Sequence, residues 1–437
     1  MRKIDIMVIF ILLVFFATSW AQEYPGFRVI GRHLYDKCGE KVILRGVNKM
    51  IIWTDKDGIP SYMEIAKTGA NVVRIVWLTT GTASELDIAI SNCIDNYMIP
   101  MIECHDATGE WDNLDMIVDY WSRPDIVSVI ENHEEYLLLN IANECGDAQV
   151  PIDTFKTGYK DAILKMREAG IHVPLIIDGT DWGKDINVLQ SQGPSLIDDD
   201  PDHNLIFSVH MWWPVMWGYS ASTVIDEIAQ SVNMELPLIV GEFGALWDTT
   251  AQGAIPYLTI LEQCHLNEIG WIAWSWGPGN NPQTFLDMTE DGTFQTLHDW
   301  GLEVTTTNSF SIANTAVRPY SIVNGECSGT AVKSNRDLVN RTGFKLEQNF
   351  PNPFNLSTKI VYEVFIPADI TLEIYNIEGQ KVRTLVNEWK AAGSYNVYWN
   401  GLSDSGINVS SGIYFYQIIV RRDSDIFKKV NKLILLR

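Results

Sequence analysis

Apolar runs recur along the first 300 or so residues of the chain at a spacing typical of strand–helix units. Eight runs rich in Val, Ile and Leu stand out, and most start about 30 to 35 residues apart. They are Ile43–Asn48, Asn71–Trp77, Pro100–Asp106, Leu137–Glu144, Pro174–Gly179, Leu205–His210, Pro237–Glu242 and Gly270–Trp276. Segments of mixed polarity lie between them, such as 61–70 and 154–170, and these close at Gly69 and Gly170, as helices often do.

Continuous apolar runs that alternate with helix-like segments predict a parallel sheet with both faces covered. Eight such units in about 280 residues fit an α/β fold of the (β/α)8 TIM-barrel type. A doubly wound open sheet is the alternative. It is disfavoured because no glycine-rich phosphate-binding loop follows the first run.

Polar and aromatic side chains stand at the ends of nearly all the runs, where a TIM barrel carries its active site. These residues are Arg74, His105, Asp106, Asn143, Glu144, Asp178, His210, Glu242 and Trp274. Glu144 and Glu242 end the fourth and seventh runs, so their carboxylates are expected to face the same mouth. Such a pair hydrolyses a glycosidic bond when one acid protonates the leaving oxygen and the other attacks the anomeric carbon or activates water.

The neighbouring strand-end residues are of types that support this chemistry. Arg74 and His210 are expected to keep Glu242 ionised through charge and hydrogen bonding. Asn143 is expected to bind the 2-hydroxyl of the sugar, and Trp274 to form an apolar floor under the ring.

Tryptophans are frequent near the predicted strand ends. Of the 16 in the chain, those at or just after the ends include Trp53, Trp77, Trp111, Trp182, Trp212, Trp213, Trp217, Trp247 and Trp276. Core packing is the ordinary explanation for any one of them. Their clustering on one rim favours stacking against sugar rings, and we predict that Trp53, Trp182, Trp212 and Trp276 join Trp274 in binding substrate.

Other functional classes lack their signatures. The chain has no GxSxG elbow, no P-loop and no HExxH motif. The six cysteines form no CxxC pair, so we expect no zinc site, although disulfides are possible. A net charge of −23 makes nucleic acid an unsuitable partner.

Seven motifs follow one another in the order and at the spacing of glycoside hydrolase family 5. They are LRGVN, AKTGANVVRIV, HDATG, NIANE, FSVHM, LPLIVGEFG and GWIAWSW. The first 300 or so residues therefore resemble this family of retaining (β/α)8 glycosidases, and within it the bacterial endo-β-1,4-mannanases. The resemblance implies Glu144 as general acid/base and Glu242 as nucleophile. It implies a surrounding set of Arg74, His105, Asn143, His210 and Trp274.

Two positions depart from the family pattern. Cys145 follows Glu144, where the family usually has Pro, or Trp in the mannanases. Trp212 stands where the family usually has a Tyr that hydrogen-bonds the nucleophile. These changes leave the substrate open between β-mannan or glucomannan and a β-1,4- or mixed-linkage glucan. A transglycosylase, or a surface carbohydrate-binding protein on an inactive barrel, are further alternatives.

The two ends of the chain predict export. Arg2 and Lys3 precede the apolar run Val8–Ala17, as in a signal peptide of residues 1–21. A membrane anchor is the alternative, but about 20 apolar residues are needed to span a bilayer. The catalytic domain is expected over 22–304, followed by a linker at 305–343 that is rich in Thr, Asn and Ser.

The remaining residues, 344–437, have a different composition. They carry 11 Lys and Arg against 9 Asp and Glu, a net charge of +2, whereas the preceding residues carry 21 against 46, or −25. Short alternating strands separated by Gly, Asn and Asp predict a small antiparallel β-sandwich. The NFPNPFN motif, the GQKV turn, the GIYFY strand and a basic last strand resemble the C-terminal sorting domain of the bacterial type IX secretion system. A carbohydrate-binding module is the alternative.

These features predict a secreted or cell-surface retaining endo-β-1,4-glycanase that acts as a monomer. The expected substrate is β-mannan or glucomannan, and an endo-β-1,4-glucanase is the alternative. We expect no cofactor and no metal. The expected partners are the β-linked polysaccharide and the type IX secretion machinery.

Overall fold

A computed structural model describes residues 25–327, 344–346, 349, 351–364, 368–377, 379–391, 393–422 and 425–436. The predicted signal peptide, residues 1–21, lies outside the described residues, as does the part of the predicted linker from 328 to 343. The chain divides into two compact units, one that ends at Cys327 and one that comprises the residues after it.

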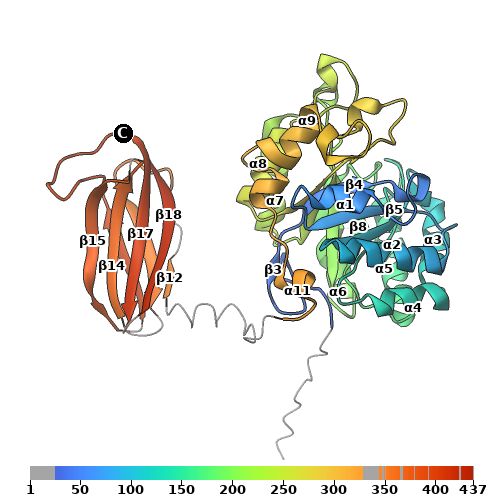
Figure 1. The fold of residues 1–437 in the computed structure, drawn as a ribbon, viewed down its shortest axis with the longest axis horizontal. Coiled ribbons are helices and arrows are strands. Elements are labelled where there is room, and N and C mark those ends of the chain that lie inside the picture. The colour runs from blue at the N-terminus through green and yellow to red at the C-terminus, as the bar shows by residue number, and fades with distance from the viewer. Residues whose placement is uncertain are drawn as a thin grey trace, which may run out of the picture. The chain divides into compact units, whose positions relative to one another are not determined.

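The first unit is built on a closed barrel of eight parallel strands (Figure 1). In chain order the strands are β4 (Arg45–Lys49), β5 (Val72–Trp77), β6 (Ile99–Cys104), β7 (Leu138–Asn140), β8 (Leu175–Asp178), β9 (Leu205–His210), β10 (Leu238–Glu242) and β11 (Gly270–Ala273). Each pairs with the next, and β11 pairs with β4 to close the barrel. Each of the eight predicted runs therefore contains a barrel strand, and the predicted TIM barrel is confirmed.

Helices follow the strands and cover the outside of the barrel. The longer ones are α1 (Ser61–Ala66), α2 (Ala83–Asp95), α3 (Leu114–Trp121), α4 (Pro124–Asn132), α5 (Ile152–Glu168), α6 (Ile186–Asp199), α7 (Ala221–Asn233) and α8 (Tyr257–Leu266). Their starts are set by local chemistry, for example the capping box of Thr82 and Glu85 at α2. Within the described ranges, no helix is both long enough and apolar enough to cross a membrane.

The end of the barrel where the strands begin is closed by a small antiparallel sheet. Its strands are β1 (Arg28–Ile30), β2 (His33–Tyr35) and β3 (Lys41–Val42). Phe27, Leu34 and Val42 pack there against the first residues of the barrel strands. They form a hydrophobic core separate from the main core of this unit, the closed-end core. The strands therefore have one sealed end and one open end, and only the open end is available for a site.

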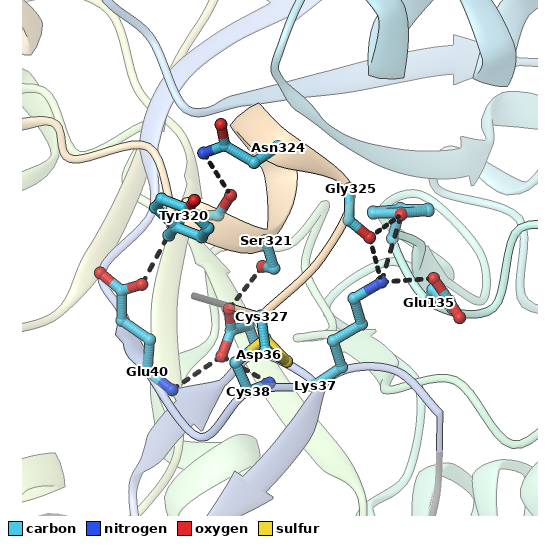
Figure 2. The surroundings of a disulfide bond; sticks show 11 residues. Asp36, Lys37, Cys38, Glu40, Glu135, Tyr320, Ser321, Asn324, Gly325 and Cys327 are labelled. Carbon is cyan, nitrogen blue, oxygen red and sulfur yellow. Dashed lines mark hydrogen bonds and ion pairs between the residues drawn. A yellow bond between two sulfur atoms is a disulfide. The ribbon is translucent and has the colours of Figure 1, made fainter. Parts of the chain in front are cut away.

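A disulfide between Cys38 and Cys327 fastens this sealed end (Figure 2). It closes a loop with a sequence separation of 289 residues, for which the chain-entropy model gives a stabilisation of about 5–6 kcal/mol. Asp36 accepts hydrogen bonds from the backbone N–H groups of Cys38 and Glu40 and from the hydroxyl of Ser321. The other four cysteines, including Cys145, are buried free thiols.

Residues 305–327, the described part of the predicted linker, fold onto the barrel instead. They form a π-helical turn at Glu303–Thr307, α10 (Ile312–Thr315) and α11 (Tyr320–Asn324), after the short α9 (Asp299–Leu302). The Arg318 guanidinium donates to the carbonyls of Ala66 and Ala70, and Ile322 is buried in the closed-end core. Thr and Asn side chains bond to these short turns rather than forming periodic elements, so the sequence of this segment resembles that of a linker.

The second unit is an antiparallel β-sandwich. One sheet has the order β12 (Phe344–Leu346), β13 (Thr358–Val364), β16 (Gly393–Trp399). The other has the order β15 (Lys381–Lys390), β14 (Ala368–Asn376), β17 (Gly412–Arg422), β18 (Asp425–Leu435). Residues from both sheets, such as Tyr362, Trp399 and Leu372, share one buried core. The predicted small antiparallel domain is therefore confirmed.

Candidate active site

Two glutamates meet at the open end of the barrel. Glu144 follows β7, Glu242 ends β10, and the two residues are only 8% and 3% exposed. One carboxylate oxygen from each, together with a ring nitrogen of His210, lie within 4.8 Å of one another. Retaining glycosidases hold their two carboxyl groups about 5–5.5 Å apart, so this spacing suits a direct attack by one carboxylate.

Glu144 is held by its backbone as well as by its side chain. Its φ of 47° is in the left-handed region, which non-glycine residues seldom occupy outside strained or functional positions. Its N–H donates to Asp178 Oδ2 at 3.0 Å, and its carbonyl accepts from Gly109 N–H at 2.9 Å. Burial, together with the negative charge of Glu242, raises the pKa of Glu144. Glu144 therefore holds its proton to a higher pH than an ordinary glutamate does.

Glu242 has the opposite surroundings. Arg74 Nη1 donates to its Oε1 at 2.8 Å, and the indole Nε1 of Trp212 donates to its Oε2 at 3.1 Å. Charge-assisted hydrogen bonds of this kind stabilise the ionised carboxylate. Trp212 thus supplies a donor to Glu242 in spite of its departure from the usual tyrosine.

Arg74 is the centre of a buried polar network. Its guanidinium donates to the amide oxygens of Asn48, Asn140 and Asn143. Glu103 and Asp178 lie 3.7 Å and 3.5 Å from it, in addition to Glu242. Burial acts to lower the pKa of Arg74, but these carboxylates raise it, so the positive charge is secured.

His210 lies between the two glutamates. Its Nδ1 is 2.8 Å from Glu144 Oε1 and 3.5 Å from Glu242 Oε2, while its Nε2 is 3.5 Å from Asp178 Oδ2. Burial acts to lower the pKa of His210, but the charges of Glu242 and Asp178 raise it to about 10. In return, His210 and Arg74 overcome the effect of burial and lower the pKa of Asp178 to about 2.

His105 and two tryptophans form one flank of the site. The His105 ring stacks on Trp274 at a centroid distance of 5.7 Å and meets Trp53 edge-on at 5.6 Å. Its Nδ1 is 2.9 Å from Glu103 Oε1. Burial lowers the pKa of His105, but the charge of Glu103 raises it overall. The indole of Trp274 is fixed by a 2.9 Å hydrogen bond to Asn280 Oδ1.

A cavity of about 590 Å³, the main cleft, opens above these groups. That volume is within the range of about 300–1,000 Å³ usual for ligand sites. Trp182, Trp217 and Trp247 line it and are 42%, 46% and 40% exposed. Exposed indoles beside buried carboxylates suit a ligand with both apolar ring faces and hydroxyl groups, as sugars have.

The structure brings nearly all of the predicted site residues together. Six of them line the main cleft: His105, Glu144, Trp182, Trp212, Glu242 and Trp274. Arg74, Asn143 and His210 contact those residues from behind, and Trp53 reaches the site through His105. The prediction for Trp276 is wrong. Its side chain is fully buried, and its indole donates to the carbonyl of Gly292, so it offers no face to a sugar.

Other residues of the site were not predicted. Asp181, Lys184, Gln283 and Leu286 line the main cleft from loops, where neither periodicity nor motif marks them. Asn48, Glu103 and Asn140 lie within strands and were overlooked, although a polar residue inside an apolar strand is an available signal. Trp217 and Trp247 were placed near the rim but given no role.

A metal ion is a possible occupant on donor types alone, because Glu144, His210 and Glu242 offer three ligand atoms. The electrostatics oppose it. Arg74 is hydrogen-bonded to Glu242, and the raised pKa of His210 makes its ring a cation. The positive charges of Arg74 and His210 balance the carboxylates of the site and repel a metal cation.

Comparison with known proteins agrees with this geometry. Residues 35–280 match the model for cellulase (glycosyl hydrolase family 5). A mannan endo-1,4-beta-mannosidase of Salipaludibacillus agaradhaerens is 33% identical over 286 residues, which are 63% of this chain and 89% of that protein. Another from Cellvibrio japonicus is 30% identical over 318 residues, 70% of this chain and 71% of that protein.

A solved structure has the same fold. The mannotriose complex of Thermomonospora fusca beta-mannanase is 31% identical, with a TM-score of 0.62 over 68% of this chain and 99% of that one. In the second unit, residues 357–424 match the model for the FlgD Ig-like domain. This match agrees with a β-sandwich and does not by itself mark a sorting domain.

Proposed function

The chain belongs to glycosyl hydrolase family 5, and from this premise we propose that it is a retaining endo-β-1,4-mannanase. The observation that carries the mechanism is the contrast between its two glutamates. Glu144 is buried with a raised pKa, whereas Glu242 accepts hydrogen bonds from Arg74 and Trp212 on its two oxygens. One is suited to hold a proton and the other to act as an anion.

In the first step Glu242 attacks the anomeric carbon and forms a glycosyl–enzyme ester. The bond to the leaving oxygen breaks, and Glu144 gives its proton to that oxygen. In the second step Glu144, now ionised, takes a proton from water. The resulting hydroxide attacks the same carbon, the ester breaks, and Glu242 leaves as a carboxylate.

The surrounding groups fit these two steps. Arg74 and Trp212 stabilise Glu242 whenever it is an anion, and His210 lies between the glutamates as charge moves from one to the other. The Asn143 carboxamide accepts from Arg74 Nη2 at 2.7 Å, which fixes the amide for binding the 2-hydroxyl. Trp274 faces the main cleft and supports the sugar ring.

Mannan is the preferred substrate because the two relatives named above are mannan endo-1,4-beta-mannosidases, and the alignments cover 89% and 71% of their lengths. A β-1,4-glucan is the second candidate. It is supported by the match to the cellulase family model, and Cys145 and Trp212, which depart from the residues usual in the family, leave the substrate open.

The test is product release by the purified full chain from linear mannan, glucomannan, carboxymethylcellulose and mixed-linkage glucan. Glu242→Gln is the control for contaminating activity. Faster cleavage of mannan than of the glucans is expected. Cleavage of the glucans alone would replace the substrate and keep the mechanism, and binding without cleavage of any of the four would support an inactive barrel.

We further propose that the enzyme is exported and that its second unit is a type IX sorting domain. The support is the NFPNPFN motif, which joins the first residues of the sandwich to its last strand. Phe354 is buried, contacts the Trp399 ring and pairs with Leu435 of β18, and the Asn349 N–H donates to the Tyr416 hydroxyl. Deleting 344–437 in a host with this machinery should abolish surface delivery, and unchanged delivery would contradict the proposal.

A further inference from the structure

A second cavity adjoins the main cleft. This side cavity has a volume of about 170 Å³ and lies between the loop that joins β8 to α6 and the first turns of α7. Since liquid water occupies about 30 Å³ per molecule, it has room for five or six waters, or for the ring of a single sugar unit. Asp181 and Lys184 line both cavities, so they form the wall between them.

The backbone of this wall is held in place. Asp181, Trp182 and Gly183 have φ values of 54°, 54° and 74°, three successive residues in the left-handed region. The Gly183 carbonyl accepts from His210 N–H at 2.8 Å, and a Cβ on Gly183 would lie 2.6 Å from the His210 ring. Trp182 N–H donates to the Gly146 carbonyl at 3.2 Å. The loop is therefore packed against the same histidine that separates the two glutamates.

Lys184 stands at the boundary between the cavities. Its ammonium is 4.9 Å from the centre of the Trp182 ring, 5.9 Å from that of Trp217 and 3.5 Å from Asp181 Oδ1. The side chain is only 10% exposed. An ammonium has three donors, so it can hold the two indoles by cation–π attraction and still donate to a bound hydroxyl.

The side cavity has the surfaces that bind an uncharged sugar. Tyr219 is half-buried and presents its ring to the cavity, and the buried Trp213 stacks behind it at 5.0 Å with ring planes 7° apart. Asp185 and Glu227 add carboxylates that accept hydrogen bonds from hydroxyl groups. Burial, together with the charges of Asp181, Asp185 and Glu227, raises the pKa of Tyr219. Three carboxylates and one ammonium, those of Asp181, Asp185, Glu227 and Lys184, line the cavity, so its net charge is negative and it repels acidic sugars.

We propose that the side cavity binds one neutral hexosyl unit of the polysaccharide that occupies the main cleft, with Lys184 contacting both. The proposal rests on the proposed function, because it needs a carbohydrate in the main cleft. The hexosyl unit comes either from the main chain beyond the units at the cut or from a neutral side branch. Both sources present the same ring and hydroxyl chemistry.

The test uses Ala148→Trp, because Ala148 is an exposed residue that lines the side cavity and a tryptophan there would fill it. Gln149→Trp is the matched control, since the neighbouring Gln149 is exposed and lines neither cavity. Both are made in the full chain with Glu242→Gln, so that ligands are bound and not cleaved. Calorimetry then gives affinities for mannotriose, mannohexaose and galactosylated mannopentaose.

We expect Ala148→Trp to lower the affinity for a larger ligand, relative to mannotriose, by about fivefold to tenfold, which is the loss of one or two hydrogen bonds. Gln149→Trp should leave this ratio unchanged. A loss with mannohexaose assigns the cavity to the main chain, and a loss with the galactosylated ligand alone assigns it to a branch. An unchanged ratio in Ala148→Trp, or an equal fall in both variants, would overturn the proposal.

Lys184→Met provides a second test that does not add bulk. It retains the apolar stem but removes the donors, and it should lower the same ratio by about fivefold. Repeating the series with cellotriose and cellohexaose separates the two hypotheses. If only the glucose oligomers bind and their ratio still falls, the side cavity is upheld and the mannan preference is wrong. If neither ratio changes in Lys184→Met, the role of Lys184 is wrong.

Discussion

Two buried arginines on adjacent strands of the barrel have opposite surroundings. Arg74 on β5 faces the open end, where three carboxylates and three asparagines surround its guanidinium. Arg45 on β4 faces the closed end and donates to the carbonyls of Leu44, Ile269 and Cys264. Among the described residues, no carboxylate forms an ion pair with Arg45. An arginine therefore neutralises buried carboxylates at the open end, and it binds backbone carbonyls at the closed end.

The pKa values of the two arginines differ in the same way. Burial lowers the pKa of Arg45 to about 10, whereas the carboxylates around Arg74 more than offset burial and raise its pKa. Arg45 also packs its guanidinium 5.4 Å from the Trp271 ring centre. Burial of a cation therefore does not by itself mark a functional site. The buried opposite charges around it do.

Arg74→Met should give the largest effect. It removes the donor to Glu242 and takes the guanidinium away from buried Glu103 and Asp178, which keep only His105 and His210 as positive neighbours. We expect kcat to fall by at least about a thousandfold. We also expect the free energy of unfolding to fall by about 3–5 kcal/mol, as when one partner of a buried ion pair is removed. Mannan hydrolysis and urea denaturation measure the two losses, and a variant with more than a tenth of wild-type kcat would contradict this role.

Glu144→Gln tests the proton donor of the open end through the pH dependence of the rate. Glu144 must be protonated in the first step, so activity should be lost as the pH rises through its raised pKa. With glutamine there, kcat/KM for mannan should drop by about 10²–10⁴-fold. For a dinitrophenyl mannoside, which needs no acid, kcat/KM should fall little and should lose its basic limb. A basic limb that persists in the variant would show that another group is the acid.

Trp212→Phe should have an intermediate effect at the same end. It preserves an aromatic ring but removes the donor to Glu242 Oε2. A hydrogen bond to a charged group contributes about 1.5–3 kcal/mol, so kcat should fall by roughly tenfold to a hundredfold. Trp247→Phe is the control, since it contacts the Trp212 ring without reaching Glu242. Equal losses in the two variants would mean that ring packing, and not the N–H donor, is what matters.

Arg45→Met should have the smallest effect on turnover and is the matched partner of Arg74→Met. It breaks bonds to backbone carbonyls at the closed end, so the free energy of unfolding should fall by about 1–3 kcal/mol. The kcat per folded molecule should not change, because the Arg45 guanidinium contacts none of the residues of the main cleft. A loss of kcat without a loss of stability would remove the distinction between the two ends.

The sequence predicts the barrel well because parallel strands buried on both faces are continuous apolar runs, and their ends are marked by Glu144, His210 and Glu242. It predicts poorly which strand residues point into the interior of the barrel. Both faces of such a strand are buried, so the pattern cannot say that Glu103 and Asn140 point inward to Arg74. For the same reason the sequence does not show that Trp274 faces the main cleft whereas the neighbouring Trp276 is buried. The pairing of Cys38 with Cys327 depends on how residues 303–327 fold back, which no local pattern records.

The most direct test of the account is to trap the glycosyl–enzyme ester. The full chain would be incubated with 2-deoxy-2-fluoro-β-mannotriosyl fluoride, digested and analysed by mass spectrometry for the modified residue. We expect one added 2-deoxy-2-fluoromannotriosyl group, attached to Glu242, and none in Glu242→Gln. An adduct on any other residue, or hydrolysis of the fluoride with inverted anomeric configuration, would contradict the assignment of Glu242 as the nucleophile.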